Sequence, residues 1–348
     1  MWSMLSIRSK KDGKVNPLKD LTICTVAFRS QFYLDLHWEL TRQLNNPQDV
    51  DWKWIVVENT PAGESECLQD HERFKILPRI EPSENYAMHP AGYQHAAGLN
   101  EALSHVHSRY VLIVDPDFFI IRKNWIKDTL EHMQRNHLSF LGSPYHPKWY
   151  TKIRYVPVGY CLFIDLDQVN RKDLDFVVYD SSQKLISDNL KKTVPPFLRK
   201  TLSPLASRLR WLIFNRRMIE KEHDTGWHLY RKMKESDYKY ECLVPVFRPQ
   251  QNFTGKAYLA PTLNNFIERF LPDERSYIPK RAGYFSLTGF KERGYPDFNA
   301  LEWEEYLWQD EPFGFHLRGY PKRDRDMRPE KEFLQDFMKN HFHASQSS

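Results

Sequence analysis

Two acidic residues separated by one proline, Asp115 and Asp117, have the types and spacing that could bind a metal ion. They directly follow an uninterrupted apolar run, residues 110–114, which is typical of a buried strand in a parallel sheet. The proline ends that strand, and ligands of open α/β sheets bind beyond the carboxyl ends of the strands. Because neighbouring carboxylates repel each other, a hard divalent cation carrying phosphate oxygens would stabilise the pair. The alternative interpretation is a simple turn that ends a strand.

The segments around this motif predict the alternating strands and helices of a nucleotide-binding α/β domain. Buried strands are expected at residues 21–27 and 52–59, and a helix at residues 90–107 leads directly into the acidic strand. Strand, helix, strand, helix and strand at this spacing favour an α/β fold. Further elements are expected downstream: helices at residues 123–137 and from 227 onward, and strands at 138–141, 156–165 and 241–247.

This arrangement resembles the nucleotide-sugar domain of glycosyltransferases with the GT-A fold, nearest the inverting family 2 kind. The resemblance covers residues 21–164, where the first strand runs into a loop, Thr25–Arg29, and the second strand ends on an acid, Glu58. Asn100 lies fifteen residues before Asp115, which matches the family's Ala-Arg-Asn helix ahead of its Asp-x-Asp motif. The resemblance implies a Rossmann-like, mixed and mostly parallel sheet flanked by helices, with helical or irregular additions on the acceptor side.

The resemblance also implies which residues bind the donor and a metal ion. The expected contacts with the nucleotide sugar are Thr25, Ala27, Arg29, Glu58, Asn100, Asp115 and Arg318. The expected ligands of Mn2+ or Mg2+ are Asp115, Asp117 and a late histidine, His316. Neutral imidazole favours Mn2+, although a lone histidine among aromatic residues can also be structural. Two positions depart from the family pattern, with Leu99 in place of an arginine and Phe118 in place of a further acid.

Asp224 is the candidate for the catalytic base. In the resembled family, an acid ahead of a helix accepts the proton of the acceptor hydroxyl as that oxygen attacks the anomeric carbon. Asp224 follows His223 and precedes the helix expected from residue 227. The same position suits a helix N-cap, and a retaining enzyme of this fold would not need Asp224 as a base.

The resemblance implies a metal-dependent transferase that uses a UDP- or GDP-linked sugar and a glycan or lipid-linked acceptor. The reaction is expected to proceed with inversion, and the first alternative is a retaining transferase of the same fold. A carbohydrate-binding or scaffold protein without turnover is a third hypothesis, because a fold alone does not establish activity. No nucleic-acid partner is expected.

The composition is typical of a globular protein. The 348 residues are 41% hydrophobic and 27% charged, with a net charge of +5. The sequence contains no signal-peptide core and no apolar run of membrane-spanning length. Its four cysteines are well separated and lack metal-type spacing, which suits a reducing compartment. A cytoplasmic protein is therefore expected.

A basic segment lies in the second half of the chain. Residues 189–219 carry eight lysines and arginines and no acid, interleaved with apolar side chains. Such a segment can lie on an anionic membrane face, bind an acidic acceptor, close over the diphosphate or dock on the core. One hypothesis is therefore peripheral contact with the inner membrane face. The expected divisions are an N-terminal tail at residues 1–20, a nucleotide-sugar-binding part at 21–165, an acceptor-side part at 166–322 and a charged tail at 323–348.

Overall fold

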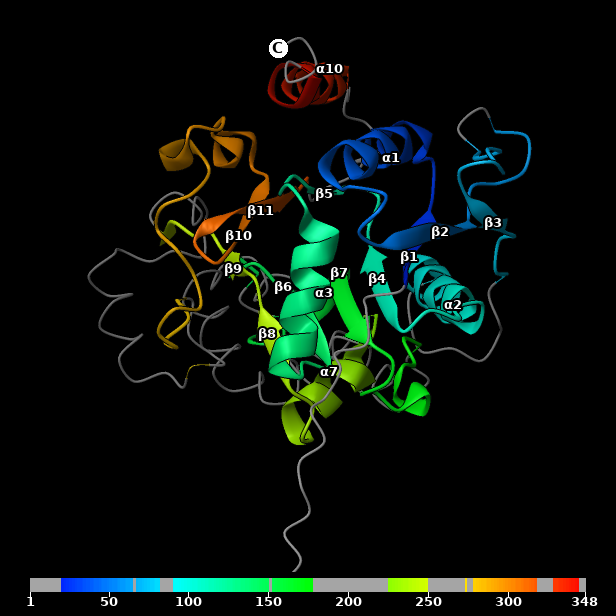
Figure 1. Ribbon diagram of the computed structural model, residues 1–348, viewed down its shortest axis with the longest axis horizontal. Helices are drawn as coiled ribbons and strands as arrows, with labels where there is room; N and C mark the ends of the chain where they lie inside the picture. Colours follow the sequence, from blue (N-terminus) through cyan, green and yellow to red (C-terminus); the bar gives the residue numbers. More distant parts are fainter. Residues whose placement is uncertain are drawn as a thin grey trace, which may run out of the picture.

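A seven-stranded mixed sheet forms the centre of the molecule (Figure 1). The computed structural model describes residues 20–64, 67–81, 90–149, 152–177, 225–249, 273, 278–317 and 328–343. The strands of this sheet are β1 (Asp20–Ala27), β2 (Asp51–Glu58), β3 (Lys75–Leu77), β4 (Tyr110–Val114), β6 (Phe140–Pro144), β7 (Pro157–Asp165) and β8 (Tyr240–Cys242). Their order is β3-β2-β1-β4-β7-β6-β8, and the pairing is parallel from β3 to β4 and between β6 and β8. The antiparallel strand β7 joins these two parts.

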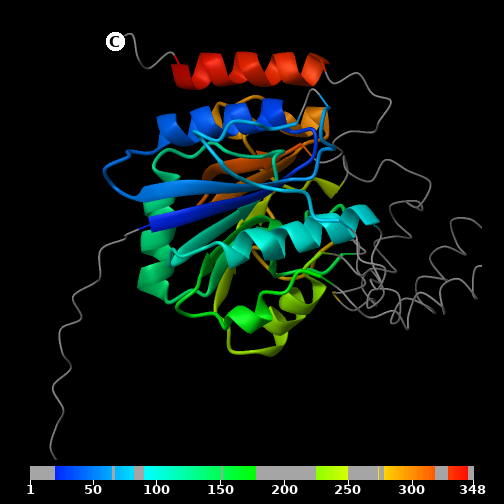
Figure 2. The same cartoon turned by 90° about the vertical axis from the view of Figure 1, so that its right-hand side faces the viewer.

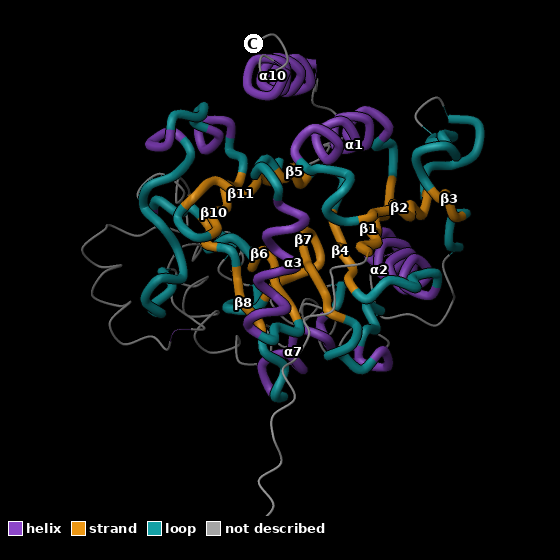
Figure 3. The backbone as a smooth tube through the Cα atoms, viewed as in Figure 1, coloured by secondary structure: helices purple, strands orange, loops and turns teal. Residues whose placement is uncertain are grey.

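A smaller four-stranded sheet is antiparallel in its described pairings and is seen beside the large one in Figure 3. Its strands are β5 (Phe118–Ile120), β9 (Val244–Pro245), β10 (Glu304–Trp308) and β11 (Glu311–His316), in the order β5-β11-β10-β9. Gly314 allows β11 to approach β5 closely, because a Cβ there would lie 2.6 Å from the carbonyl oxygen of Phe119. The chain passes from β4 in the large sheet to β5 in the small one through the Asp-Pro-Asp turn. That turn is therefore held between two sheets.

Helices cover the large sheet on both faces. α1 (Gln31–Leu44) and α2 (Pro90–Ser104) lie on opposite faces of it, as Figure 2 shows. The other helical segments are α3 (Trp125–Asn136), α7 (Trp227–Glu235) and α10 (Arg328–Met338), with short turns of 3-10 helix at Arg171–Asp173, Lys291–Arg293 and Phe298–Leu301 and of π-helix at Lys339–His343. Among the residues that the structure describes, no helix is long and apolar enough to cross a membrane.

The α/β architecture expected from the sequence is confirmed. The elements expected at residues 21–27, 52–59, 90–107, 110–114, 123–137, 138–141 and 156–165 correspond to β1, β2, α2, β4, α3, β6 and β7. The strand expected at 241–247 is instead divided between β8 in the large sheet and β9 in the small one. The division occurs at Leu243, whose N–H donates to the carbonyl oxygen of Gly142 in β6 at 2.8 Å. A continuous apolar pattern did not reveal that the chain changes sheets there.

α10 forms where a charged C-terminal tail was expected. Leu334 and Phe337 are buried, and the ring of Phe337 packs against Phe298 with the centroids 5.1 Å apart. The ammonium group of Lys331 lies 5.0 Å from the ring centroid of Phe32 in α1. Figures 1 and 2 show α10 lying over α1. Because the segment is highly charged, its sequence predicts a tail. It instead forms a helix whose apolar face packs on the small sheet and on α1.

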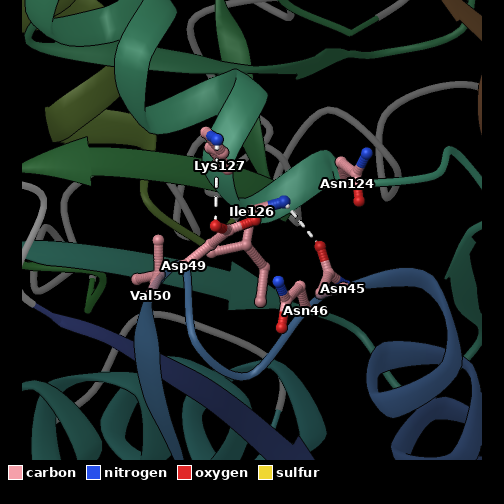
Figure 4. A pocket seen from close by; sticks show the side chains of 7 residues that line it. All are labelled: Asn45, Asn46, Asp49, Val50, Asn124, Ile126 and Lys127. Carbon is pink, nitrogen blue, oxygen red and sulfur yellow. Dashed lines mark hydrogen bonds and ion pairs between the residues drawn. The ribbon is translucent and has the colours of Figure 1, made fainter.

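The start of α3 is anchored by the residue that follows α1 (Figure 4). The side-chain oxygen of Asn45 accepts a hydrogen bond from the N–H of Ile126 at 2.9 Å, which satisfies a donor in the first turn of α3. Asn124, just before the helix, has a left-handed backbone with a φ of 56°. An ion pair of 3.8 Å joins Lys127 to Asp49. These contacts line a small polar hollow and fix the direction of the chain after β5.

His37 of α1 lies against the turn that joins β4 to β5. Its imidazole is buried, stacks on Phe119 with the ring centroids 4.4 Å apart, and donates a hydrogen bond to the carbonyl oxygen of Pro116. Burial lowers the pKa of His37 to about 4, although the charge of Asp117 and the bond to Pro116 act in the opposite direction. His37 is therefore neutral in the folded protein at neutral pH.

We predict that His37 makes the folded state less stable in mild acid. Its pKa is about 4 in the folded state and near the ordinary value of 6.5 in the unfolded chain, so the unfolded state binds more protons between these values. The free energy of unfolding should therefore fall by about 2 kcal/mol between about pH 7 and pH 5. His37→Gln keeps an N–H donor but does not titrate, so urea unfolding at the two pH values should show a decrease smaller by that amount. An equal decrease in both proteins would contradict the assignment.

Candidate metal and donor site

The Asp-Pro-Asp turn places two carboxylates at the carboxyl end of β4. The N–H of Asp115 donates to the carbonyl oxygen of Tyr160 at 3.1 Å, and the N–H of Phe118 donates to the carbonyl oxygen of Asp115 at 3.1 Å. Pro116 fixes its own φ, so the backbone between the two acids has little freedom. The side chains remain accessible, with exposed fractions of 24% for Asp115 and 14% for Asp117. Both carboxylates therefore lie at the edge of the sheet where α/β proteins bind ligands.

The small sheet brings His316 to the same turn. His316 ends β11, where it pairs with Phe118 of β5, and the N–H of Leu317 donates to the carbonyl oxygen of Asp117 at 3.0 Å. The Nε2 atom of His316 lies 3.1 Å from Oδ1 of Asp117. Ligand atoms of Asp115, Asp117 and His316 all lie within 4.8 Å of one another, close enough to share one metal ion. The structure thus groups the three residues that the sequence suggested as metal ligands.

The groups around His316 fit a divalent cation. A carboxylate faces each ring nitrogen, with Asp117 at 3.1 Å from Nε2 and Glu304 at 3.6 Å from Nδ1. A neutral imidazole carries only one N–H, so one of these carboxylates would face a lone pair. A cation between Nε2 and the two aspartates removes that conflict and also the repulsion between Asp115 and Asp117. Two carboxylates with one imidazole suit Mn2+, whereas Mg2+ prefers oxygen ligands alone.

A buried cysteine behind the site does not add a ligand. Cys161 of β7 pairs with Val114, the last residue of β4. Burial raises the pKa of its thiol well above the usual range, and the negative charge of Asp115 acts in the same direction. The thiol therefore stays protonated and neutral, and the donor atoms at the site are carboxylate oxygen and imidazole nitrogen.

His95 also reaches the site, and the sequence did not predict it. It comes from α2, and its Nε2 lies 3.3 Å from Oδ1 of Asp115. The helix was expected only to lead into the acidic strand and to carry Asn100, which lies five residues after His95. A histidine within a run of alanine and glycine is the signal that could have identified it.

Glu304 is a second residue that the sequence did not identify. It is fully buried in β10 and lies directly opposite His316 in the pairing of β10 with β11. Two adjacent acids at the start of an aromatic strand are the signal that could have revealed it, because a buried carboxylate needs partners.

Thr25 and Ala27 have roles inside the sheet. Both residues are fully buried. The hydroxyl of Thr25 donates to the carbonyl oxygen of Val114 at 3.0 Å and accepts from Nε1 of Trp54 at 3.0 Å. These side chains build the strand end that supports the site, and their contact with the donor stays a prediction.

Arg29 and Glu58 organise the loop after β2. Both carboxylate oxygens of Glu58 accept backbone N–H groups, from Thr60 at 2.7 Å and from Leu68 at 2.8 Å. Arg29 donates two hydrogen bonds to Glu64, at 2.6 and 2.9 Å, and these bonds lower the pKa of that partly exposed carboxyl group. The two residues hold the loop in place, and their contact with a nucleotide stays a prediction.

Asn100 connects α2 to the start of α7. Its side-chain oxygen accepts the N–H of Phe176 at 3.0 Å, and its side-chain nitrogen donates to Asp175 at 2.7 Å. The carbonyl oxygen of Phe176 in turn accepts the N–H of Gly226 at 2.9 Å. Asn100 therefore positions the chain that enters α7, and its contact with the donor stays a prediction.

α7 is anchored at the same edge of the sheet as the acidic turn. The hydroxyl of Tyr230 in α7 accepts the N–H of Gly159 at 2.9 Å. The next residue in β7 is Tyr160, whose carbonyl oxygen accepts the N–H of Asp115 at 3.1 Å. The first turn of α7 and the Asp-Pro-Asp turn are thus attached to adjacent residues of one strand.

Asp224 and Arg318 lie outside the described residues, as does the basic segment 189–219. The roles expected for them stay predictions. The N-cap position of α7 is occupied by Gly226, with a φ of 79°, and not by Asp224. Asp224 is therefore not the N-cap residue of α7.

Three solved structures are similar to parts of this chain at low identity. S. aureus TarS 1–349, in complex with UDP-GlcNAc, is 18% identical over 40% of this chain and 37% of its own, with a TM-score of 0.28. Mannosyltransferase PcManGT from Pyrobaculum calidifontis, in complex with GDP-Man and Mn2+, is 12% identical over 42% of this chain and 44% of its own, with a TM-score of 0.30. Mouse xyloside xylosyltransferase 1 is 10% identical over 65% of this chain and 85% of its own, with a TM-score of 0.33. The chain spans less than half the length of the first two, and likeness at these scores carries no argument about its activity.

A family match covers the part of the chain that holds the acidic turn. Residues 51–185 match the model of glycosyl transferase family 2, a span that begins with β2 and includes β4, β5 and β7. No curated protein is similar enough to the chain to match it. The mostly parallel sheet between helices agrees with the expected fold over this span. Residues 51–185 are therefore similar to glycosyl transferase family 2, and the described strands form the mixed, mostly parallel sheet expected of a GT-A fold.

Proposed function

We propose that the protein is a metal-dependent glycosyltransferase that moves a sugar from a nucleoside-diphosphate sugar to a glycan or other hydroxyl acceptor, with inversion. The observation that supports this most is the group formed by Asp115, Asp117 and His316 at the carboxyl end of β4. Two of these residues belong to the family 2 segment, and the third is added by the small sheet. A UDP- or GDP-linked sugar with Mn2+ or Mg2+ is the proposed donor complex.

The three ligands would hold a metal ion against the diphosphate of the donor. A divalent cation there neutralises the charge that develops on the leaving nucleoside diphosphate. The backbone bonds of Asp115 hold its carboxylate in place before the donor arrives, and His95 at 3.3 Å restrains it further. Arg318 directly follows Leu317, the residue bonded to Asp117, so its guanidinium is proposed to contact the same diphosphate.

Asp224 is proposed as the general base. Its carboxylate would accept the proton of the acceptor hydroxyl while that oxygen bonds to the anomeric carbon and the bond to the diphosphate breaks. Position in the chain supports this role, because Gly226 begins α7 two residues later and is bonded to Phe176 at 2.9 Å. Tyr230 fixes the same helix to Gly159, next to the strand end that carries the metal group.

A retaining transferase of the same fold is the second candidate. It is favoured by one observation, namely that a histidine late in the chain completes the metal group. In that case Asp224 is not needed as a base. The configuration of the product anomer, determined by NMR, distinguishes the two reactions. A carbohydrate-binding protein without turnover would bind a donor and release no nucleoside diphosphate.

The first prediction of this proposal concerns the metal. Asp117→Asn should remove Mn2+-dependent turnover, and it should also remove the Mn2+-dependent part of the rise in Tm caused by a nucleotide sugar, because only the folded state binds these ligands. Asp167→Asn is the matched control, since that carboxylate follows β7 at the other end of the sheet and its side chain is 67% exposed. Full turnover of Asp117→Asn, or of the natural protein in excess chelator, would disprove the metal site.

The second prediction concerns the base. Asp224→Asn keeps the size of the side chain but cannot accept a proton, so turnover should fall by about two orders of magnitude or more. Donor affinity, measured by calorimetry with Mn2+ present, should change little, because the base contacts the acceptor hydroxyl. Turnover near that of the natural protein would remove Asp224 from the mechanism and favour the retaining alternative.

The third prediction concerns the acceptor side. The basic segment 189–219 is proposed to hold the protein at an anionic membrane face that carries a lipid-linked acceptor, and each of its eight cations there would contribute about 1 kcal/mol. Vesicles containing anionic lipid should therefore sediment the protein at low salt and release it at high salt. Equal and negligible sedimentation with neutral and anionic vesicles would rule out this attachment.

A further inference from the structure

We propose that Glu304 is a positioning residue that orients His316 toward the metal ion and couples the metal group to the loop Tyr145–Trp149. The inference rests on the proposed metal site. Glu304 is fully buried and lies directly opposite His316 in the antiparallel pairing of β10 with β11. Residues paired in this way project their side chains from the same face of a sheet, within reach of each other.

The two carboxylate oxygens of Glu304 face different partners. Oε2 lies 3.6 Å from Nδ1 of His316 and accepts the hydroxyl of Tyr306 at 3.1 Å. Oε1 accepts the indole N–H of Trp149 at 2.6 Å and lies 3.1 Å from Nζ of Lys148. The ammonium group offsets the charge of the buried carboxylate, and the other donors occupy its lone pairs. One side chain therefore contacts both His316 and the loop Tyr145–Trp149.

The contact with Nδ1 determines which nitrogen of His316 is available to a metal. A cation at Nε2 excludes the proton from that atom, and the negative charge of Glu304, 3.6 Å from Nδ1, favours the proton on Nδ1. Nε2 is the atom that lies 3.1 Å from Asp117. The ring of Tyr160 packs against the imidazole with the centroids 4.7 Å apart and limits its rotation. Glu304 thus selects the tautomer, and Tyr160 holds the plane of the ring.

The contact with Trp149 makes the loop part of the same unit. The indole is 40% exposed, yet its N–H is directed inward to Glu304. The loop follows β6 and is closed by a hydrogen bond from the N–H of Trp149 to the carbonyl oxygen of His146 at 2.9 Å. Because linkage is reciprocal, a loop contact that strengthens metal binding is itself strengthened when the metal binds.

Two neighbouring glutamates provide a matched pair of variants. Glu304 and Glu305 are both fully buried in β10, but Glu305 accepts the N–H groups of Phe290 and Phe298, at 2.8 and 3.1 Å, on the other face of the strand. Glu304→Gln would direct an amide N–H at Nδ1 of His316 and so favour the tautomer that blocks Nε2. Glu305→Gln makes the same chemical change away from the metal group.

The test is Mn2+ binding to the full chain without donor, measured by titration of the EPR signal of free Mn2+. Glu304→Gln should raise the dissociation constant about 10–100-fold, the usual effect of losing the carboxylate partner of a metal-bound histidine. Glu305→Gln should bind Mn2+ as the natural protein does. Circular dichroism at the temperature of the titration establishes that each variant is folded.

Trp149→Phe keeps the inference testable if Glu304→Gln does not fold. It retains an aromatic ring at a partly exposed position and removes only the N–H that holds Oε1. The dissociation constant for Mn2+ should rise by a smaller factor than in Glu304→Gln. An unchanged constant in either folded variant would overturn the role of Glu304 while leaving the metal site intact. Absence of Mn2+ binding by the natural protein would overturn the metal site itself.

Discussion

Repulsion between two carboxylates held close together is the constraint on which the site depends. Asp115 and Asp117 cannot move apart, because Pro116 and the backbone bonds of the turn fix the chain between them. The surrounding elements contribute groups that can offset this negative charge. His95 comes from α2 and His316 from β11, and both nitrogens lie within 3.3 Å of an aspartate oxygen. A bound cation would offset the remaining negative charge of the two aspartates, and the same electrostatic effect would serve the proposed chemistry.

Because the turn lies between two sheets, the two aspartates are held in fixed positions relative to the groups that offset their charge. β4 ends in the large sheet and β5 begins in the small one. Asp115 directly follows β4, and Asp117 directly precedes β5. His37 supports the turn from the side of α1, where burial keeps its imidazole neutral and lowers its pKa to about 4. A charged histidine at that place would repel a cation bound by the two aspartates, whereas a neutral one supports the backbone without doing so.

The fold and the site could be predicted from the sequence where the determining interactions are local. The apolar run of β4 and the proline after it specify a buried strand that ends on two acids, and the structure agrees. The roles of Glu58 and Thr25 could not be read in the same way, because their partners Leu68 and Val114 are brought to them by loop and sheet geometry. The inward direction of His95 depends on how α2 rotates against the sheet, which a pattern of small residues does not specify.

Long-range pairing explains what else the sequence concealed. The position of Glu304 beside His316 depends on the register of β10 with β11, and the neighbouring residues in the chain do not indicate that register. The division of one apolar run between β8 and β9 also follows from which strands lie next to it. Family resemblance supplied His316 where residue patterns alone could not, since it is 199 positions from Asp117.

That separation has a consequence for the order in which the protein is made. A chain emerging from the ribosome that has been synthesised only through β8 contains both aspartates and all seven strands of the large sheet, but not β10 or β11. Domains form progressively from the N-terminus during synthesis, and contacts between distant segments come last. The imidazole ligand and the glutamate behind it therefore arrive together, on one hairpin, near the end of translation. The group formed by Asp115, Asp117 and His316 can therefore assemble only after β11 has been made, and a product truncated before β11 lacks its third member.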